Sequence, residues 1–191
     1  MKKILIILLA LACAFTMFSC GGDSVKGFDK AIKDTKPTVV NVVIETETAL
    51  GLLKANYETT YAEDGSFTIN YSYEKFNGIS EGAAEDVIAV VSGTVTCDKD
   101  GNYSDGGALV GTATTATGAK IKLGKKMEYS VSRDGNVLTA TIKAANTKSV
   151  LGAEFPADVT LVLTKAEGKI VSYTINYTTD AGVTNIICEY K

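Results

Sequence analysis

Residues 67–74 read FTINYSYE, in which apolar and polar side chains alternate without interruption. Successive side chains of a β-strand point to opposite faces of the sheet, so this period of two predicts a strand with one buried face and one wet face. Threonine, isoleucine and tyrosine also pack well on a pleated surface. Residues 159–164 and 171–178 show the same alternation. An all-β fold is therefore expected from residue 38 onward.

Short glycine-centred turns separate the predicted strands, at 63–65, 99–102, 133–136, 167–168 and 180–182. Turns at this frequency leave no room for crossover helices, so consecutive strands are expected to pair antiparallel in a meander. Nine to eleven strands are expected near 38–48, 50–61, 66–76, 86–97, 103–111, 119–131, 137–145, 158–165, 169–179 and 183–190. Such a meander hides its apolar face as a barrel, a half-barrel or a two-layer sandwich, and the alternation does not choose among them.

The amino terminus has the three parts of a secretory signal. Lys2 and Lys3 precede a fifteen-residue apolar run at 4–18, and the small residue Ser19 stands before Cys20. Fifteen helical residues reach about 22 Å, whereas a membrane core is ~30 Å thick. The short run favours cleavage of the segment over a membrane span.

Residues 17–20, MFSC, followed by Gly21 and Gly22, resemble the lipobox of bacterial lipoproteins, although Met17 replaces the usual leucine. The resemblance implies a diacylglycerol on Cys20, cleavage before it and acylation of the new amino group. Two or three acyl chains give lasting attachment to a bilayer. Cys13 is a rival site that would leave a shorter apolar run, and an ordinary signal peptide cleaved without lipidation is the other alternative.

These features divide the chain into a signal peptide (1–19), a lipid anchor with a flexible tether (20–37) and a single antiparallel β-domain (38–191). Val25, Phe28 and Ile32 have the spacing of a short helix within the tether, but Gly27 and Pro37 disfavour it. The expected location is the bacterial cell envelope, at the outer membrane or cell surface, with the bilayer as partner through the acyl anchor.

Charge and cysteine content restrict the partners and the cross-links. Without the signal the chain keeps 17 basic and 22 acidic residues, so no basic patch for nucleic acid is expected. Cys13 would leave with the signal and Cys20 would carry lipid, so only Cys97 and Cys188 remain in the domain. They either form one disulfide or stay as two separate buried thiols.

The chain contains no histidine, which excludes a Ser-His-Asp or Cys-His catalytic site. A catalytic pair of carboxylates stays open, because Asp and Glu far apart in sequence can meet on one sheet face. Nothing marks such a pair, and the acidic residues lie mostly in turns and on wet strand faces, so we expect no enzyme and no cofactor beyond the lipid. A weak calcium candidate is the run of oxygen-bearing side chains at Asp98, Asp100, Asn102 and Ser104. Gly101 and Leu109 do not match the EF-hand positions, and a hairpin turn explains the same residues.

Two functions follow from these expectations. The first is a non-catalytic binding module for a protein partner or an apolar small molecule. Apolar residues on both faces of one strand would support a cavity for it, and Val39, Val40, Val42, Val43 and Ile44 come closest to that pattern. The second is a structural or host-facing surface protein without a ligand pocket.

Overall fold

The protein folds around one antiparallel β-sheet, seen in a computed structural model that describes residues 22–76, 88–106, 120–124 and 126–191. Nine strands form the sheet within these ranges. They are β1 (Val39–Thr48), β2 (Gly51–Tyr61), β3 (Phe67–Phe76), β4 (Ile88–Cys97), β5 (Glu128–Val131), β6 (Val137–Ile142), β7 (Val159–Ala166), β8 (Lys169–Thr179) and β9 (Gly182–Tyr190). The predicted all-β, antiparallel fold is confirmed.

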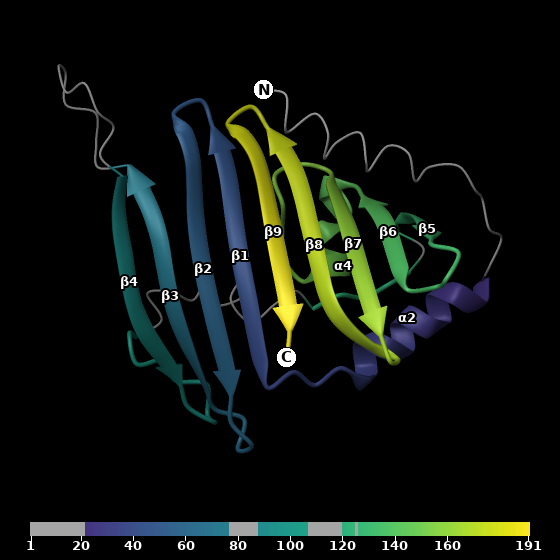
Figure 1. Cartoon of the computed structure of the whole chain (residues 1–191), viewed down its shortest axis with the longest axis horizontal. Helices are drawn as coiled ribbons and strands as arrows, with labels where there is room; N and C mark the ends of the chain where they lie inside the picture. Colours follow the sequence, from purple (N-terminus) through teal and green to yellow (C-terminus); the bar gives the residue numbers. More distant parts are fainter. Residues whose placement is uncertain (1–21, 77–87, 107–119, 125) are drawn as a thin grey trace.

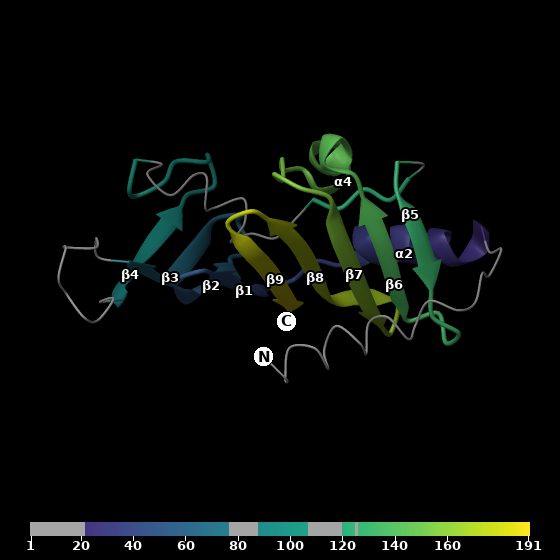
Figure 2. The ribbon, with the colours of Figure 1, turned by 90° about the horizontal axis from the view of Figure 1, so that it is seen from above.

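The sheet is open, with the strand order β4-β3-β2-β1-β9-β8-β7-β6-β5, so that β4 and β5 form its two edges (Figure 1). Seen from above, it bends across its width (Figure 2). Of the three architectures that the alternation left open, this curled sheet corresponds to the half-barrel.

Two meanders, β1–β4 and β5–β9, meet where the first strand pairs with the last. Val42 lies opposite Cys188, and Val40 lies opposite Tyr190. The backbone of Lys191 continues the pairing, because its N–H donates to the carbonyl of Val39 at 2.9 Å. All other neighbouring strands are consecutive along the chain, as the turn spacing predicts. The β1–β9 pair joins both ends of the domain at the centre of the sheet.

The two faces of the sheet differ as the alternation predicts. Asn41, Asn176 and Asn185 lie on the outer face, where Asn176 donates a hydrogen bond to Asn185. The opposite face, called the core face below, carries the buried apolar side chains of both meanders. They include Val40, Val42, Tyr57, Ile69, Leu138, Leu161, Leu163, Tyr173, Ile175 and Cys188.

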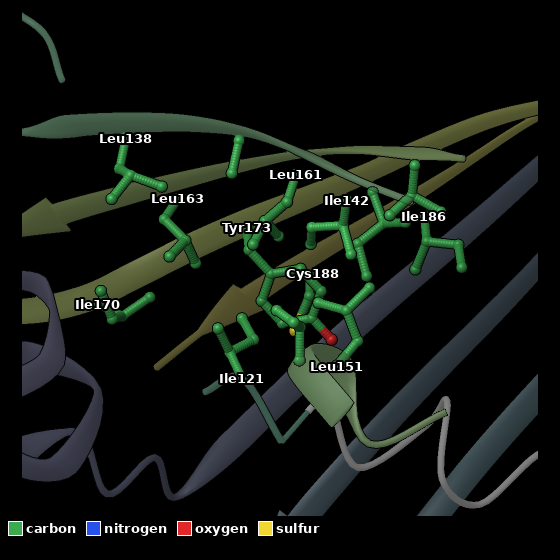
Figure 3. Close-up of a cluster of buried hydrophobic side chains, with 14 of the residues drawn as sticks. Ile121, Leu138, Ile142, Leu151, Leu161, Leu163, Ile170, Tyr173, Ile186 and Cys188 are labelled. Carbon is green, nitrogen blue, oxygen red and sulfur yellow. The ribbon is translucent and has the colours of Figure 1, made fainter. Parts of the chain in front are cut away.

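Helical segments cover part of the core face: α2 (Gly22–Asp34), the short 3-10 helix η1 (Ala144–Asn146) and α4 (Thr147–Leu151). Phe28 and Ala31 of α2 join the same apolar cluster as Leu151 of α4. Leu151 lies beside Cys188 and Ile121 (Figure 3). No helix of the described ranges combines the length and the apolar character that crossing a membrane requires.

Part of the segment expected to be a flexible tether is instead the helix α2. Phe28 is fully buried, and the Lys165 ammonium lies 5.0 Å from the centroid of its ring. Neither Gly27 nor Pro37 prevents the helix. Gly27 is tolerated because tertiary packing of the apolar side of α2 outweighs its low helix propensity, and Pro37 lies beyond the end of the helix.

Two predicted strands also differ from the structure. In the span 103–111, Tyr103 forms an isolated bridge with Cys97, the chain then turns at Gly106, and residues 107–111 lie outside the described residues. In the described part of the span 119–131, only Glu128–Val131 is a strand. Residues 120–124 pass over the core face and bury Ile121 there, so their apolar residues reflect packing on the sheet rather than pairing within it.

Candidate functional site

A pocket of about 430 Å³ lies between the end of α2, the segment 120–122 and the core face. We call it the α2 pocket. Its apolar walls are Ile32 and Pro37 on one side, Ile121 on the second and Ile170 at the start of β8 on the third. Small-molecule sites in proteins have this size and this mainly apolar lining.

Thr35 fixes the end of α2 to the sheet. Its backbone N–H and its hydroxyl both donate to the carbonyl of Ala31, at 3.0 and 2.6 Å. The same hydroxyl oxygen accepts the N–H of Ile170 at 2.8 Å. One side chain therefore ends the helix and sets the position of Ile32 relative to Ile170.

The segment 120–122 is held from the other side by α4. The N–H of Lys122 donates to the carbonyl of Val150 at 2.7 Å. Within the neighbouring η1–α4 turn, the buried Thr147 hydroxyl donates to the carbonyl of Ala144 at 2.8 Å and accepts the N–H of Phe155 at 3.1 Å. These bonds fix the wall that Ile121 forms.

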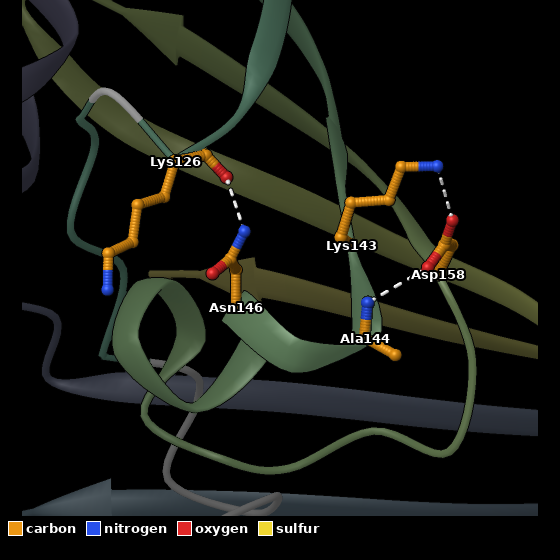
Figure 4. A network of polar contacts seen from close by, with 5 residues as sticks. All are labelled: Lys126, Lys143, Ala144, Asn146 and Asp158. Carbon is orange, nitrogen blue, oxygen red and sulfur yellow. Dashed lines mark hydrogen bonds and ion pairs between the residues drawn. The ribbon is translucent and has the colours of Figure 1, made fainter.

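Polar contacts at the surface attach the η1–α4 turn to neighbouring segments of the same chain, at Asp158 and Lys126 (Figure 4). The Asp158 carboxylate accepts the N–H of Ala144 at 2.9 Å and pairs with the Lys143 ammonium at 2.8 Å. These bonds hold the pKa of Asp158 below its usual value, led by the Lys143 hydrogen bond. Asn146 donates a long hydrogen bond, 3.5 Å, to the carbonyl of Lys126.

Two tyrosines complete the pocket from the sheet. Tyr61 ends β2 and Tyr190 ends β9, so they approach the pocket from strands on either side of β1. Burial, with the neighbouring Cys188 as a further cause, raises the pKa of the Tyr190 hydroxyl well above its usual value. Tyr190 therefore presents a neutral ring and hydroxyl at physiological pH.

Lys120 and Lys122 are the charged residues that line the pocket, and both are exposed. An apolar interior beside two cations is suited to an amphiphile with an anionic group. The described residues that line the pocket include no Asp, Glu or His. Among the described residues, no group of three or more His, Cys, Asp or Glu side chains is placed to hold a metal ion.

A second pocket, of about 370 Å³, lies over β1–β3 towards the other end of the strands. Ile44, Leu53, Ala55, Tyr57 and Tyr73 line it, with Lys54 and Glu74 also present. The Lys54 ammonium pairs with Glu45 at 2.8 Å, and the Glu74 carboxylate accepts the backbone N–H of Lys54 at the same distance. Both charged side chains of the second pocket thus have a polar partner. For the lysines of the α2 pocket, by contrast, no ion pair is seen within the described residues.

The structure has different outcomes for the three cysteines to which the sequence assigns a chemical role. Cys20, the expected lipidation site, lies outside the described residues. Cys97 and Cys188 do not form the disulfide that the sequence allows, since both are free, buried thiols. Cys97 is on the edge strand β4, and Cys188 is on β9, with three strands between them. Neighbouring strands lie about 4.8 Å apart, whereas a disulfide needs Cα atoms within about 7 Å.

The weak calcium candidate is a hydrogen-bonded turn. The Asp98 carboxylate accepts the N–H groups of Asp100 and Asn102, both at 2.9 Å, and the Asn102 amide at 2.8 Å. These bonds lower the pKa of Asp98, with the Asn102 side chain as the largest cause. Ser104 instead accepts the N–H of Thr96 at 3.0 Å. The oxygen atoms thus hold a hairpin turn together.

The sequence points to the α2 pocket only in part. The helical spacing that includes Ile32, and the alternation that places Tyr190, are visible signals. Nothing in the sequence brings Ile121 to Ile170, because the segment 120–122 crosses from a remote part of the chain. In the strand expected to border a cavity, Val40 and Val42 are fully buried on the core face, whereas Ile44 lines the second pocket.

Comparisons with known proteins add one likeness. No protein-family model matches the chain, and no curated protein matches it. Among solved structures, LprF from Mycobacterium bovis is similar, with 12% sequence identity and a TM-score of 0.41 over 90% of this chain and 94% of that one.

Proposed function

We propose that the protein is a lipid-anchored envelope lipoprotein whose β-domain is a non-catalytic binding module for an apolar small molecule. The observation that carries the proposal is the α2 pocket, with its apolar walls and its two lysines at one side. A structural surface protein without a pocket would not require such a site. The lack of histidine supports the non-catalytic part of the proposal.

The chemistry of the walls indicates the class of ligand. An alkyl chain against Ile32, Ile121 and Ile170 gains about 0.8 kcal/mol per buried methylene. An anionic group at the other end of the ligand would lie near Lys120 and Lys122. The proposed ligand is therefore a single-chain anionic amphiphile.

The proposed anchor sets where this binding takes place. Lipid on Cys20 would hold the domain at the membrane surface, where amphiphiles are concentrated. Only Gly21 separates Cys20 from the first residue of α2, so the anchor would lie one helix length from the pocket. A ligand that leaves the bilayer would then have a short path to the pocket.

Photochemical labelling tests the proposal with the full-length chain in its membrane. Palmitate carrying a diazirine on its chain is the probe, and its methyl ester is the uncharged comparison. The expected result is covalent labelling of peptides that contain Ile121 and Ile170. Ile32→Trp, which fills the pocket, should reduce this labelling several-fold.

Charge variants separate binding of the anionic group from contact with bulk lipid. Lys120→Glu with Lys122→Glu should reduce labelling by palmitate and leave labelling by the methyl ester unchanged. Lys75→Glu is the matched control, since Lys75 is an exposed lysine on β3 that does not line the pocket. Equal labelling of the wild type and Ile32→Trp would show that the probe is not in the pocket.

A further inference from the structure

Within the described residues, the edge strand β4 has, from Ile88 to Thr94, none of the features that usually protect a sheet edge. Over ten residues it contains no proline and no charged side chain. Ile88 and Val90 are exposed, Val90 at 64% of its surface. Soluble proteins normally block such an edge with charge, proline, a bulge or a covering segment, because an open edge pairs with further strands.

The hydrogen bonds at the end of β4 show which backbone groups point outwards. The carbonyl of Thr96 accepts the N–H of Ser104 at 2.9 Å, and the N–H of Thr96 donates to the Ser104 hydroxyl at 3.0 Å. Outward-pointing residues alternate along an antiparallel strand, and the β3–β4 register is continuous. Ile88, Val90, Ser92 and Thr94 therefore direct their N–H and C=O groups away from β3. No described residue pairs with these four.

We propose that β4 pairs with β4 of a second copy of the chain, antiparallel, about a two-fold axis at Val91. In this register Ile88 lies opposite Thr94 of the other copy, and Val90 lies opposite Ser92. All four open residues on each side are used, and Thr96 keeps its bonds to Ser104. Four hydrogen-bonded residue pairs, with two bonds in each, would supply about eight backbone hydrogen bonds.

The side chains of β4 favour a second copy over a strand of another chemistry. On the core face, Val91 would meet Val91, and Ala89 would meet Gly93. No two like charges would face each other, because an uncharged strand that pairs with a copy of itself brings no charges together. Gly93 is closely fitted already, since a Cβ there would lie 2.6 Å from the Tyr71 hydroxyl oxygen.

The opposite edge favours a closed pair over a growing chain of molecules. β5 has four residues, Glu128–Val131, and the first of them is charged. It offers β4 a short and poorly matched partner, so head-to-tail association is disfavoured and the two-fold pair is the closed alternative. A two-fold axis along the sheet normal turns the same face of both copies in one direction. Two chains anchored in one membrane could therefore pair.

Disulfide trapping in the full-length chain tests this register. Val91→Cys places two thiols across a non-hydrogen-bonded pair, where Cα atoms are about 4.5 Å apart and a disulfide can form. Mild oxidation of membranes should give a product of twice the chain's mass. Ala89→Cys is the matched control on the same face, because the two thiols would be four residues out of register, about 13 Å apart. The unsubstituted chain, with Cys97 and Cys188 buried, gives the background.

A second substitution tests the edge itself. Val90→Lys changes an exposed side chain and leaves the core unchanged, so a chain with Val90→Lys and Val91→Cys should fold but should lose the cross-link. Absence of cross-linking in Val91→Cys alone, or equal cross-linking in Ala89→Cys, would overturn the proposal. A product of Val91→Cys that contains another protein would also overturn it and would assign the edge to a partner's strand. The proposal does not depend on the ligand of the α2 pocket.

Discussion

Cys188 is a fully buried thiol on β9. The sequence offers it as half of a disulfide, yet β9 lies at the centre of the sheet and Cys97 at its edge. Both thiols instead behave as small buried apolar groups. Cys188 lies beside Tyr173 on the next strand, and Leu151 covers it from α4 (Figure 3).

The burial of Cys188 predicts loss of stability at alkaline pH. Burial raises the pKa of its thiol from 9.0 to about 11, so the folded state holds this proton more tightly than the unfolded state. The resulting contribution, about 3 kcal/mol, is complete below pH 9 and is lost as the pH rises to about 11. Tyr190, whose pKa is also raised, acts in the same direction.

Urea unfolding between pH 8 and 11 measures this effect. The free energy of unfolding should fall over that interval in the wild type and fall less in Cys188→Ala, which lacks the titrating thiol. The comparison uses the slope with pH, so the stability that Cys188→Ala loses at neutral pH does not affect it. Parallel slopes for the two proteins would contradict the account.

At the scale of elements, local pattern predicts strands well. The alternation places a strand at 66–76, and the structure has Phe67–Phe76. The turn at Asp98 to Asn102 is likewise visible from its residue types. The sequence does not reveal the pairing of β1 with β9, because no turn joins them and each has the same alternating pattern as other strands. The path of 120–124 over the core face is non-local for the same reason.

Helix α2 was underestimated from the sequence, and one substitution tests its importance for stability. Phe28 is fully buried, so Phe28→Ala should lower the free energy of unfolding by about 3–5 kcal/mol. Lys30→Ala, at an exposed position of the same helix, should change it by less than about 0.5 kcal/mol. Denaturant unfolding followed by circular dichroism gives both values. A small loss in both variants would mean that α2 is a detachable tether.

On the scale of the whole molecule, the chain joins three features: the proposed anchor at Cys20, the half-covered sheet and the open edge of β4. α2 links the first two, since it begins two residues after Cys20 and ends at the pocket. Composition and alternation predict the sheet, but only the folded arrangement reveals a pocket at one end of α2. The open edge of β4 is likewise apparent only once the strand order is known.

The proposed anchor predicts the cellular fraction in which the chain is found. Cys20→Ser removes the acceptor thiol and should shift the full-length chain out of the lipid-modified membrane pool, which metabolic labelling with a radioactive fatty acid detects. Cys13→Ser is the matched control and should keep the label, because Cys13 would leave with the signal. Label retained in Cys20→Ser, or lost in Cys13→Ser, would contradict the assignment of the anchor.

The most direct test of the central claim is native mass spectrometry of the full-length protein purified from the membranes of its own host. We expect a non-covalent adduct with the mass of a single-chain anionic amphiphile on the wild type, and its loss in Ile32→Trp. Spectra that show only the covalently modified chain, identical for the wild type and Ile32→Trp, would contradict it.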